Sequence, residues 1–284
     1  MNVQEKNILV NGLNVHYWEA GQGQARALLL IHGGVGDAKL HWEPVLPLLA
    51  ETYHVLAPDL PGYGGSEMLP FNRTDVLLHW IKAFIDTLQL EQVVLVGNAF
   101  GALIVRLFAA TNPKYVPAVI LINGGGVPDL PVFFKVVQKI PGLSNIIFAQ
   151  LGKMMTNPSA LQRLVHIKPV LTDGFYADAK KAAYPFSRLM QLLVNSDLPS
   201  ERIPLVPTLI LWGVEDTFTP PGDREAIQAS IPGAVLTEIA DCGHMPQLET
   251  PDVFSWQITT FLEKLSRPTT ATKGGPKPLR KLSG

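Results

Sequence analysis

Cysteine is almost absent from this chain, since its 284 residues include only Cys242. A lone cysteine cannot form an internal disulfide, which fits a reducing compartment and predicts a cytoplasmic protein. Cys242 stands two residues before His244, a spacing that would also suit a thiol nucleophile. The ordinary role of such a cysteine is that of a small buried residue. We therefore interpret Cys242 as part of the core.

The chain also lacks an excess of charge of either sign. Its net charge of −1 gives no electrostatic argument for nucleic acid or an anionic membrane as a partner. The mean hydropathy of +0.19 is high, but no apolar run approaches the roughly 20 residues that a membrane-spanning helix needs. The first residues, MNVQEKNILVNG, do not resemble a signal peptide. We expect a small-molecule substrate and neither nucleic acid nor membrane, with a homodimer left open.

What the sequence does contain is a series of apolar strands that alternate with helical segments. Asn11-Gly12 between the first two strands is typical of a two-residue hairpin turn. The expected strands cover residues 7–10, 13–19, 27–32, 53–57, 93–96, 119–123, 208–212 and 235–239. The expected helices cover residues 42–50, 76–88, 103–110 and 251–265. This alternation predicts an α/β fold: a mostly parallel eight-stranded sheet with helices on both faces and an antiparallel hairpin at one edge.

One connection is too long for this pattern, because more than eighty residues separate Asn123 from Thr208 and ordinary loops have about six. Its composition is helical, with repeated prolines and many Phe and Met residues. We expect residues 125–195 to form a helical cap inserted after the sixth strand, over a core made of residues 1–124 and 196–267. Framework helices packed beside the sheet are the alternative. Residues 268–284 are basic and poor in apolar residues, which predicts a disordered tail.

The segment on which the functional interpretation depends runs from Gln92 to Ala109. A strand of Val and Leu ends at Gly97, Gly101 follows four residues later, and a helical run comes next. This is the strand–turn–helix of a G-x-S-x-G site, in which small flanking residues let strand and helix approach closely. The tip of the turn is Ala99, where a nucleophile is expected. The sequence therefore has the setting for covalent catalysis without its nucleophile.

Two later loops carry an acid and a histidine. Asp216 follows the strand 208–212, and His244 follows the strand 235–239. Open α/β sheets place their ligand sites at these carboxyl ends of parallel strands, and the chain order nucleophile, acid, histidine is that of an α/β-hydrolase triad. We expect Asp216 to orient His244, and His244 to act as base and then as acid. Glu215 is the alternative acid, while Asp59 and Asp241 are assigned other loop roles.

A glycine-rich loop after the third strand is the second motif on which the predicted site depends. An oxyanion hole needs two backbone N–H groups directed at a developing negative charge. We expect them from Gly34 and Phe100, with Val35 as the competitor of Gly34. The neighbours Gly33, Val35, Asn98 and Met245 are expected to contact the substrate. The seven histidines show no metal-ligand spacing, and no cofactor or metal is expected.

Together these motifs resemble those of the α/β-hydrolase fold superfamily, over roughly residues 13–265. They are His32-Gly-Gly, Asp59-Leu-Pro-Gly-Tyr-Gly-Gly-Ser, Gly97-x-x-x-Gly101, Gly213-x-x-Asp216 and Gly243-His244. Gly97-Asn98-x-Phe100-Gly101 and Asn123-Gly-Gly-Gly are similar to segments of the meta-cleavage-product C–C hydrolases and related carboxylesterases. The chain departs from those C–C hydrolases at Met245, where they usually carry Trp. Arg163 and Arg188 are the candidates for their cap arginine.

The resemblance implies a serine-type hydrolase of a small, largely apolar ester or vinylogous diketone, acting through a Ser-Asp-His triad. Ala99 then represents an inactivating Ser→Ala substitution. The alternative is a native alanine in a non-hydrolytic protein. Such a protein would either bind a ligand or use His244 and Asp216 as a general base in a lyase, cyclase or cofactor-free oxygenase. Dehalogenases and epoxide hydrolases fit less well, because they carry Asp at the turn.

Overall fold

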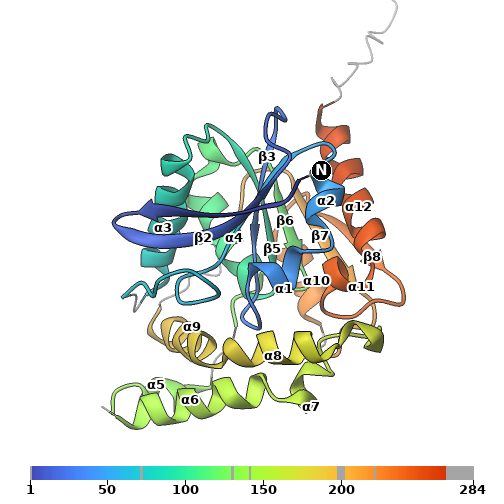
Figure 1. The fold of residues 1–284 in the computed structure, drawn as a ribbon. Helices are drawn as coiled ribbons and strands as arrows, with labels where there is room; N and C mark the ends of the chain where they lie inside the picture. Colours follow the sequence, from blue (N-terminus) through green and yellow to red (C-terminus); the bar gives the residue numbers. More distant parts are fainter. Residues whose placement is uncertain are drawn as a thin grey trace, which may run out of the picture.

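An eight-stranded sheet runs through the molecule in a computed structural model that describes residues 2–70, 73–128, 131–140, 142–196, 202–220 and 222–266 (Figure 1). Its strands lie in the order β1-β2-β4-β3-β5-β6-β7-β8. They are β1 Gln4–Val10, β2 Leu13–Ala20, β3 Ala27–Ile31, β4 His54–Pro58, β5 Val93–Asn98, β6 Val119–Ile122, β7 Thr208–Gly213 and β8 Val235–Ile239. The tail expected at residues 268–284 lies outside the described residues.

The sheet is antiparallel at one edge and parallel elsewhere, as the sequence predicted. β1 pairs antiparallel with β2, and β2 pairs antiparallel with β4. All pairs from β4 through β3 to β8 are parallel. Val10 pairs with Leu13, so Asn11 and Gly12 form the hairpin turn, with φ angles of 49° and 83°. These positive values suit a turn whose twist matches that of the two strands.

Helices surround the sheet, and among the residues described none is long and apolar enough to cross a membrane. The α-helices are α1 Ala38–Trp42, α2 Leu46–Leu49, α3 Thr74–Thr87, α4 Phe100–Thr111, α5 Val132–Val137, α6 Leu143–Met155, α7 Pro158–Leu161, α8 Asp173–Lys181, α9 Ala183–Asn195, α10 Asp223–Ser230, α11 Pro246–Glu249 and α12 Pro251–Ser266. Two 3₁₀ turns are η1 Pro113–Tyr115 and η2 Lys168–Val170.

The buried strands divide their side chains between two cores. In β3, Leu29 and Ile31 pack with α3 and α4 on one face, whereas Leu28 and Leu30 pack with α1, α2 and α12 on the other. This alternation follows from the two-residue period of a strand. Because both faces are covered by helices, the strands are apolar along their whole length, which is why the sequence shows continuous apolar runs.

Helices α5 to α9 lie between β6 and β7 in the chain and form a separate layer in Figure 1. We call them the cap helices. α6 packs against α9, and a Cβ at Gly152 would lie only 2.1 Å from the carbonyl oxygen of Ala183. The fold class predicted from the sequence, with helices added after the sixth strand, is thereby confirmed. The division into a cap of residues 125–195 and a core of 1–124 and 196–267 stays a prediction.

The single helix predicted over residues 42–50 is wrong. The chain forms α1 and α2 with a turn between them. Pro44 explains the break, because a proline inside a helix has no N–H and its ring clashes with an earlier carbonyl. Pro47 lies in the first turn of α2, where proline is tolerated. α1 begins earlier than predicted because the Asp37 side chain accepts the N–H of Leu40 and caps the helix.

Candidate active site

The turn at Ala99 joins the sheet to α4. β5 ends one residue before Ala99 and α4 begins one residue after it. Ala99 has φ 52° and ψ −111°, a conformation that costs a non-glycine residue on the order of 1–3 kcal/mol. A Cβ at Gly101 would lie 2.2 Å from the Ile31 carbonyl oxygen, and one at Gly124 would lie 2.6 Å from Ala99 Cα. The predicted strand–turn–helix is therefore present, held by close backbone contacts, with a methyl group at its tip.

The loops after β7 and β8 bring Asp216 and His244 together. His244 Nδ1 lies 2.9 Å from Asp216 Oδ2, and the two side chains are 4% and 0% exposed. The same oxygen accepts hydrogen bonds from Thr219 Oγ1 at 2.6 Å and Asn123 Nδ2 at 2.8 Å. Asp216 Oδ1 accepts the backbone N–H groups of Phe218 at 2.8 Å and Thr219 at 3.1 Å. With Nδ1 donating to this fixed carboxylate, Nε2 of His244 is left to accept a proton.

The surroundings of Asp216 keep its carboxyl group ionised. Burial alone would raise its pKa, but the hydrogen bond and charge of His244 act in the opposite direction. The hydrogen bonds from Thr219 and Asn123 add to this effect, so the pKa of Asp216 lies below its ordinary value. The ionised carboxylate can therefore stabilise a protonated imidazole at His244.

Gly34 and Phe100 both lie on the wall of the cavity that Ala99 faces. Phe100 is the first residue of α4, and the first N–H groups of a helix have no partner within it. The Gly34 carbonyl accepts a hydrogen bond from the Tyr63 hydroxyl at 2.9 Å. A Cβ at Gly34 would lie 2.7 Å from the ring of Phe186. Glycine at this position thus leaves room for an aromatic ring of α9 directly over the backbone.

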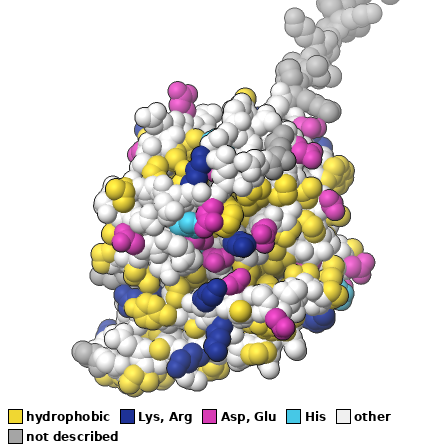
Figure 2. Space-filling model, viewed as in Figure 1, with side chains coloured by type: hydrophobic (Ala, Val, Ile, Leu, Met, Phe, Trp, Pro, Cys, Tyr) yellow, Lys and Arg dark blue, Asp and Glu magenta, His cyan; other side chains and the backbone are white. Residues whose placement is uncertain are grey.

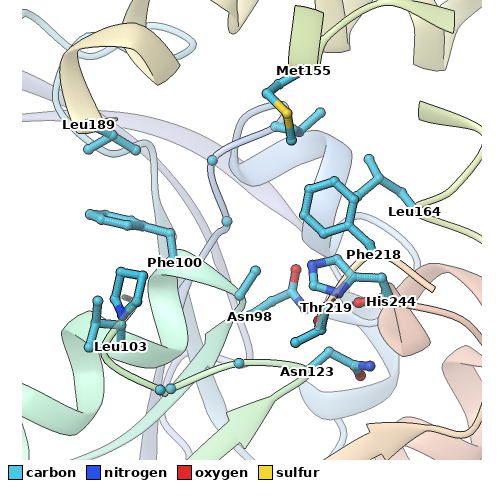
Figure 3. A pocket seen from close by; sticks show the side chains of 18 of the residues that line it. Asn98, Phe100, Leu103, Asn123, Met155, Leu164, Leu189, Phe218, Thr219 and His244 are labelled. Carbon is cyan, nitrogen blue, oxygen red and sulfur yellow. Dashed lines mark hydrogen bonds between the residues drawn. The ribbon is translucent and has the colours of Figure 1, made fainter. Parts of the chain in front are cut away.

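A cavity of 330 Å³ gathers the candidate residues (Figure 3). Its wall includes Gly33, Gly34, Val35, Asn98, Ala99, Phe100, His244 and Met245. The cap helices add apolar side chains, among them Leu151, Met155, Phe186, Leu189 and Met190. In Figure 3, Met155 and Leu189 lie across the open space from Asn98, Thr219 and His244. Of the residues singled out from the sequence as catalytic, Asp216 alone is not on the wall, because it lies behind His244.

The described residues on this wall include neither Lys nor Arg. Asp223 is the acidic residue among them, and burial together with the charge of Asp216 raises its pKa. His41 also lines the cavity, and burial lowers the pKa of its imidazole to about 3, so this ring is neutral. The cavity is therefore apolar, with its polar groups gathered around Ala99 and His244.

Asn98 holds the turn to the histidine loop. Its Nδ2 donates to the carbonyl oxygens of His244 at 3.1 Å and Ile122 at 3.3 Å. We expected this residue to contact the substrate, and it does line the cavity. These hydrogen bonds, however, join β5 to β6 and to the backbone of His244, which gives Asn98 a positioning contact that the sequence did not predict.

Glu249 joins the histidine loop to the cap. Its Oε1 accepts the backbone N–H groups of Gly243 at 3.0 Å and Met245 at 3.3 Å. Its Oε2 accepts those of His166 at 2.6 Å and Ile167 at 2.8 Å. One nearly buried carboxylate therefore holds the residues on both sides of His244 and a segment of the cap.

The other candidates from the sequence lie outside this arrangement. Cys242 is buried, and burial raises the pKa of its thiol to about 12, which removes it as a nucleophile. Glu215 is exposed, while Arg163 donates to the Thr217 carbonyl at 2.8 Å and Arg188 donates to Gln191. Neither arginine lines the cavity. Across the part of the chain that the structure describes, no group of three or more His, Cys, Asp or Glu residues could hold a metal ion.

Comparison with known proteins decides the family. The model of the alpha/beta hydrolase family matches residues 28–255, which is most of the chain. The chain belongs to this family. The match includes every candidate residue of the cavity named above, from the glycine loop after β3 to His244. This family member therefore carries its family's core together with an alanine at the strand–helix turn.

Several relatives of this chain are named as hydrolases. This chain is 28% identical to 2-hydroxy-6-oxononadienedioate/2-hydroxy-6-oxononatrienedioate hydrolase 2 of Pseudomonas putida, over 88% of this chain and 92% of that protein. It is 26% identical to 2-hydroxy-6-oxo-6-phenylhexa-2,4-dienoate hydrolase of Burkholderia cepacia, over 92% and 95%. A serine-to-alanine mutant of a meta-cleavage product hydrolase from Pseudomonas fluorescens IP01 has a similar fold, with a TM-score of 0.71, 24% identity and coverage of 92% and 98%. The predicted enzyme class, an α/β-fold hydrolase, is confirmed at this level.

Proposed function

We propose that this site is that of a serine-type hydrolase for small, uncharged and largely apolar esters, with Ala99 standing at the position of the nucleophile. The observation that carries the proposal is the pair His244–Asp216 beside the strained turn. The pair is held by hydrogen bonds to both carboxylate oxygens and opens on an apolar cavity. This arrangement supplies a base, its orienting acid and a substrate space around one backbone position.

The roles follow from the geometry once a serine replaces Ala99. The serine Oγ attacks the ester carbonyl carbon while His244 Nε2 takes its proton. The N–H groups of Phe100 and Gly34 hold the oxyanion, and His244 returns the proton to the leaving alcohol. A water molecule that gives a proton to His244 then attacks the acyl carbon. The bond between the acyl carbon and the serine oxygen breaks, His244 returns the proton to that oxygen, and the acid leaves. Asp216 stays ionised throughout and stabilises the charged imidazole.

The apolar cavity favours esters over the C–C substrates of the relatives. The names of those relatives describe dienoates and dioates, which are carboxylates. A carboxylate that leaves water needs a positive partner or several N–H donors. The described wall residues include no Lys or Arg, and Asp223 would repel an anion. Arg163 and Arg188, the candidates for a cap arginine, donate elsewhere. We infer an uncharged substrate on these grounds.

A second function is favoured by Ala99 itself. The strained turn and the His244–Asp216 pair persist around a side chain that cannot attack a carbonyl. In a chain where alanine is native, His244 and Asp216 would act as a general base on a bound ligand without a covalent intermediate, or the cavity would only bind. Lyases, cyclases and cofactor-free oxygenases on this fold are the corresponding classes, by analogy of fold alone.

Restoring the nucleophile separates the two functions. We expect Ala99→Ser to hydrolyse p-nitrophenyl acetate and butyrate with an initial burst of nitrophenol. The gain should be large, because loss of such a serine costs about a million-fold in turnover in a measured protease. The matched control is the double variant Ala99→Ser/His244→Ala, which should lose both burst and turnover. A folded Ala99→Ser protein without esterase activity would leave the noncovalent function as the better explanation.

A further inference from the structure

The outer side of the cap presents apolar side chains to solvent. They come from α5, from the turn after it and from α6. The set, which we call the cap face, consists of Val132 (73% exposed), Phe133 (57%), Val136 (56%), Ile140 (44%), Ile146 (68%) and Met154 (53%). Figure 2 shows hydrophobic and basic side chains near one another on the lower part of the molecule, where the cap helices lie in Figure 1. Exposed apolar side chains gathered on one part of a molecule indicate a candidate interaction site.

The charges within the cap face are all positive. Lys135, Lys139 and Lys153 are exposed among its apolar side chains, and none of them pairs with a carboxylate of the described residues. Residues 131–172 contain neither Asp nor Glu. The chain as a whole has a net charge of −1, so its basic residues are separated from its acidic ones in this region. Net charge alone hides this separation.

We propose that the cap face docks on the surface of an anionic lipid bilayer. Apolar side chains interleaved with lysines, without acidic residues, are the pattern of helices that lie in the interface of a membrane. The apolar groups enter the boundary between headgroups and acyl chains, and each lysine near the surface strengthens binding to anionic lipid. The proposal departs from the expectation of no membrane partner, which rested on net charge. It does not depend on the chemistry at Ala99.

The same charges argue against a second copy of the chain as the occupant. A symmetric dimer places the same patch on both subunits, so the three lysines of one copy would face those of the other. No carboxylate of residues 131–172 is available to pair with them. A bilayer with anionic headgroups complements these lysines and also accepts the apolar side chains between them.

Docking on this face would bring the membrane next to the cavity. Ile146 and Met154 of α6 are exposed, whereas Leu151 and Met155 of the same helix line the cavity. One helix therefore separates the proposed lipid surface from the apolar space beside His244. The inference predicts that ligands of this cavity are apolar molecules that partition into membranes.

The test measures binding of the full chain, with Ala99 in place, to lipid vesicles by co-sedimentation. Vesicles of phosphatidylcholine are compared with vesicles that also contain phosphatidylglycerol. We expect binding to the anionic vesicles, weakened by added salt. Replacing the three lysines by Gln should weaken it roughly a hundredfold, and Phe133→Ser/Ile146→Ser should abolish it. All five side chains are exposed, and circular dichroism checks that the variants fold.

Matched controls locate the binding surface. Trp256 (61% exposed) and Lys264 lie on α12, away from the cap in Figure 1, so Trp256→Ser and Lys264→Gln should bind like the wild type. Gln variants of Lys273, Lys277, Arg280 and Lys281 test the basic tail in the same way.

Absence of binding to anionic vesicles overturns the proposal. So does binding that the α12 or tail variants lose and the cap-face variants keep. A dimer in sedimentation analysis that Phe133→Ser/Ile146→Ser disrupts, without vesicle binding, would assign the face to a second copy.

Discussion

At the scale of single residues, Ala99 occupies a conformation that costs free energy, although its methyl group can neither attack nor transfer a proton. The conformation persists because the surrounding backbone leaves no alternative. Gly101 brings α4 against the carbonyl of Ile31, and Gly124 brings the loop after β6 against Ala99. The shape of the turn is therefore a property of the packing around residue 99 and is independent of the side chain at its tip.

Gly101→Ala tests this dependence. The added Cβ would lie 2.2 Å from the Ile31 carbonyl oxygen, a backbone atom that cannot move away as a side chain would. We expect a loss of about 3 kcal/mol in the free energy of unfolding, measured by urea denaturation. Gly174→Ala in α8 is the control, because its nearest neighbour would be Thr172 Oγ1 at 3.6 Å. It should be neutral or stabilising by up to ~1 kcal/mol. Equal effects of the two substitutions would show that the close approach of Gly101 to the Ile31 carbonyl does not hold the turn.

The sequence predicted the residues that touch the cavity better than those that hold them. Ala99, Gly34 and His244 follow strand ends, and strand ends can be recognised locally. Asn123 and Thr219, which bind the Asp216 carboxylate, went unassigned because their role arises only from long-range contacts. A local signal did exist for Thr219, since a hydroxyl three residues after Asp216 can reach back to its carboxylate, as an Asx-type turn does.

At the scale of elements, the cap and the histidine loop are joined by few hydrogen bonds. The His244 N–H donates to the Leu164 carbonyl at 2.9 Å, and Glu249 accepts N–H groups from both segments. Neither segment belongs to a strand or an α-helix in this region. The hydrogen bonds that place His244 relative to the cap therefore come from one carboxylate and one backbone pair, beside the apolar packing of Leu164 and Val165 with Met245.

Glu249→Ala should release the cap segment from the histidine loop. Four backbone N–H groups would lose a charged acceptor, so we expect a loss of about 2–4 kcal/mol in the free energy of unfolding. We also expect faster amide hydrogen exchange at His166 and Ile167. Exchange followed by NMR or mass spectrometry measures the second effect. Glu91→Ala, at an exposed position, is the control. Unchanged protection of those two amides would show that other contacts hold the cap.

The fold was predictable from the sequence wherever one pattern dominated. Apolar runs located β3 to β7 to within a few residues, because burial on both faces leaves few polar residues in these strands. β1 and β2 are more polar, and the Asn11-Gly12 turn between them located the hairpin. The single helix predicted over residues 42–50 is wrong because the apolar spacing of this segment does not show that Pro44 interrupts it. The exposure of the cap face was not predictable, since Val132 and Phe133 have the composition of a core and only the packing of α5 shows that they face solvent.

At the scale of the whole molecule, buried histidines contribute to the pH dependence of stability near neutral pH. Burial lowers the pKa of His32 and His41, so the unfolded state binds more protons than the native state below about pH 6.5. Stability should therefore fall as the pH drops below that value.

His16 differs, because hydrogen bonds to Asp59 and Glu5 raise its pKa against the effect of burial. The contribution of His16 to the free energy of unfolding is complete below about pH 6.5, and it is lost as the pH rises through the pKa of His16 in the native state.

His16→Gln should reveal this contribution. His16 Nδ1 lies 2.7 Å from Asp59 Oδ2, and Nε2 lies 2.8 Å from Glu5 Oε1. We expect the variant to be less stable than the unsubstituted chain at about pH 6, with a difference that shrinks as the pH rises to about 9. Urea denaturation at a series of pH values measures it. His79→Gln, on an exposed part of α3, should show no such trend. A difference independent of pH would mean that His16 contributes packing and no charge.

The strained turn at residue 99 also has a genetic consequence. Every alanine codon becomes a serine codon when its first base changes from G to T. Because β5, α4 and the surrounding glycines already hold position 99 in the strained conformation of the strand–helix turn, a single point mutation in the gene would place a hydroxyl there, at the position of the proposed nucleophile, with no rearrangement of the protein. Libraries made by error-prone replication and screened on a chromogenic ester would therefore be expected to return this change repeatedly.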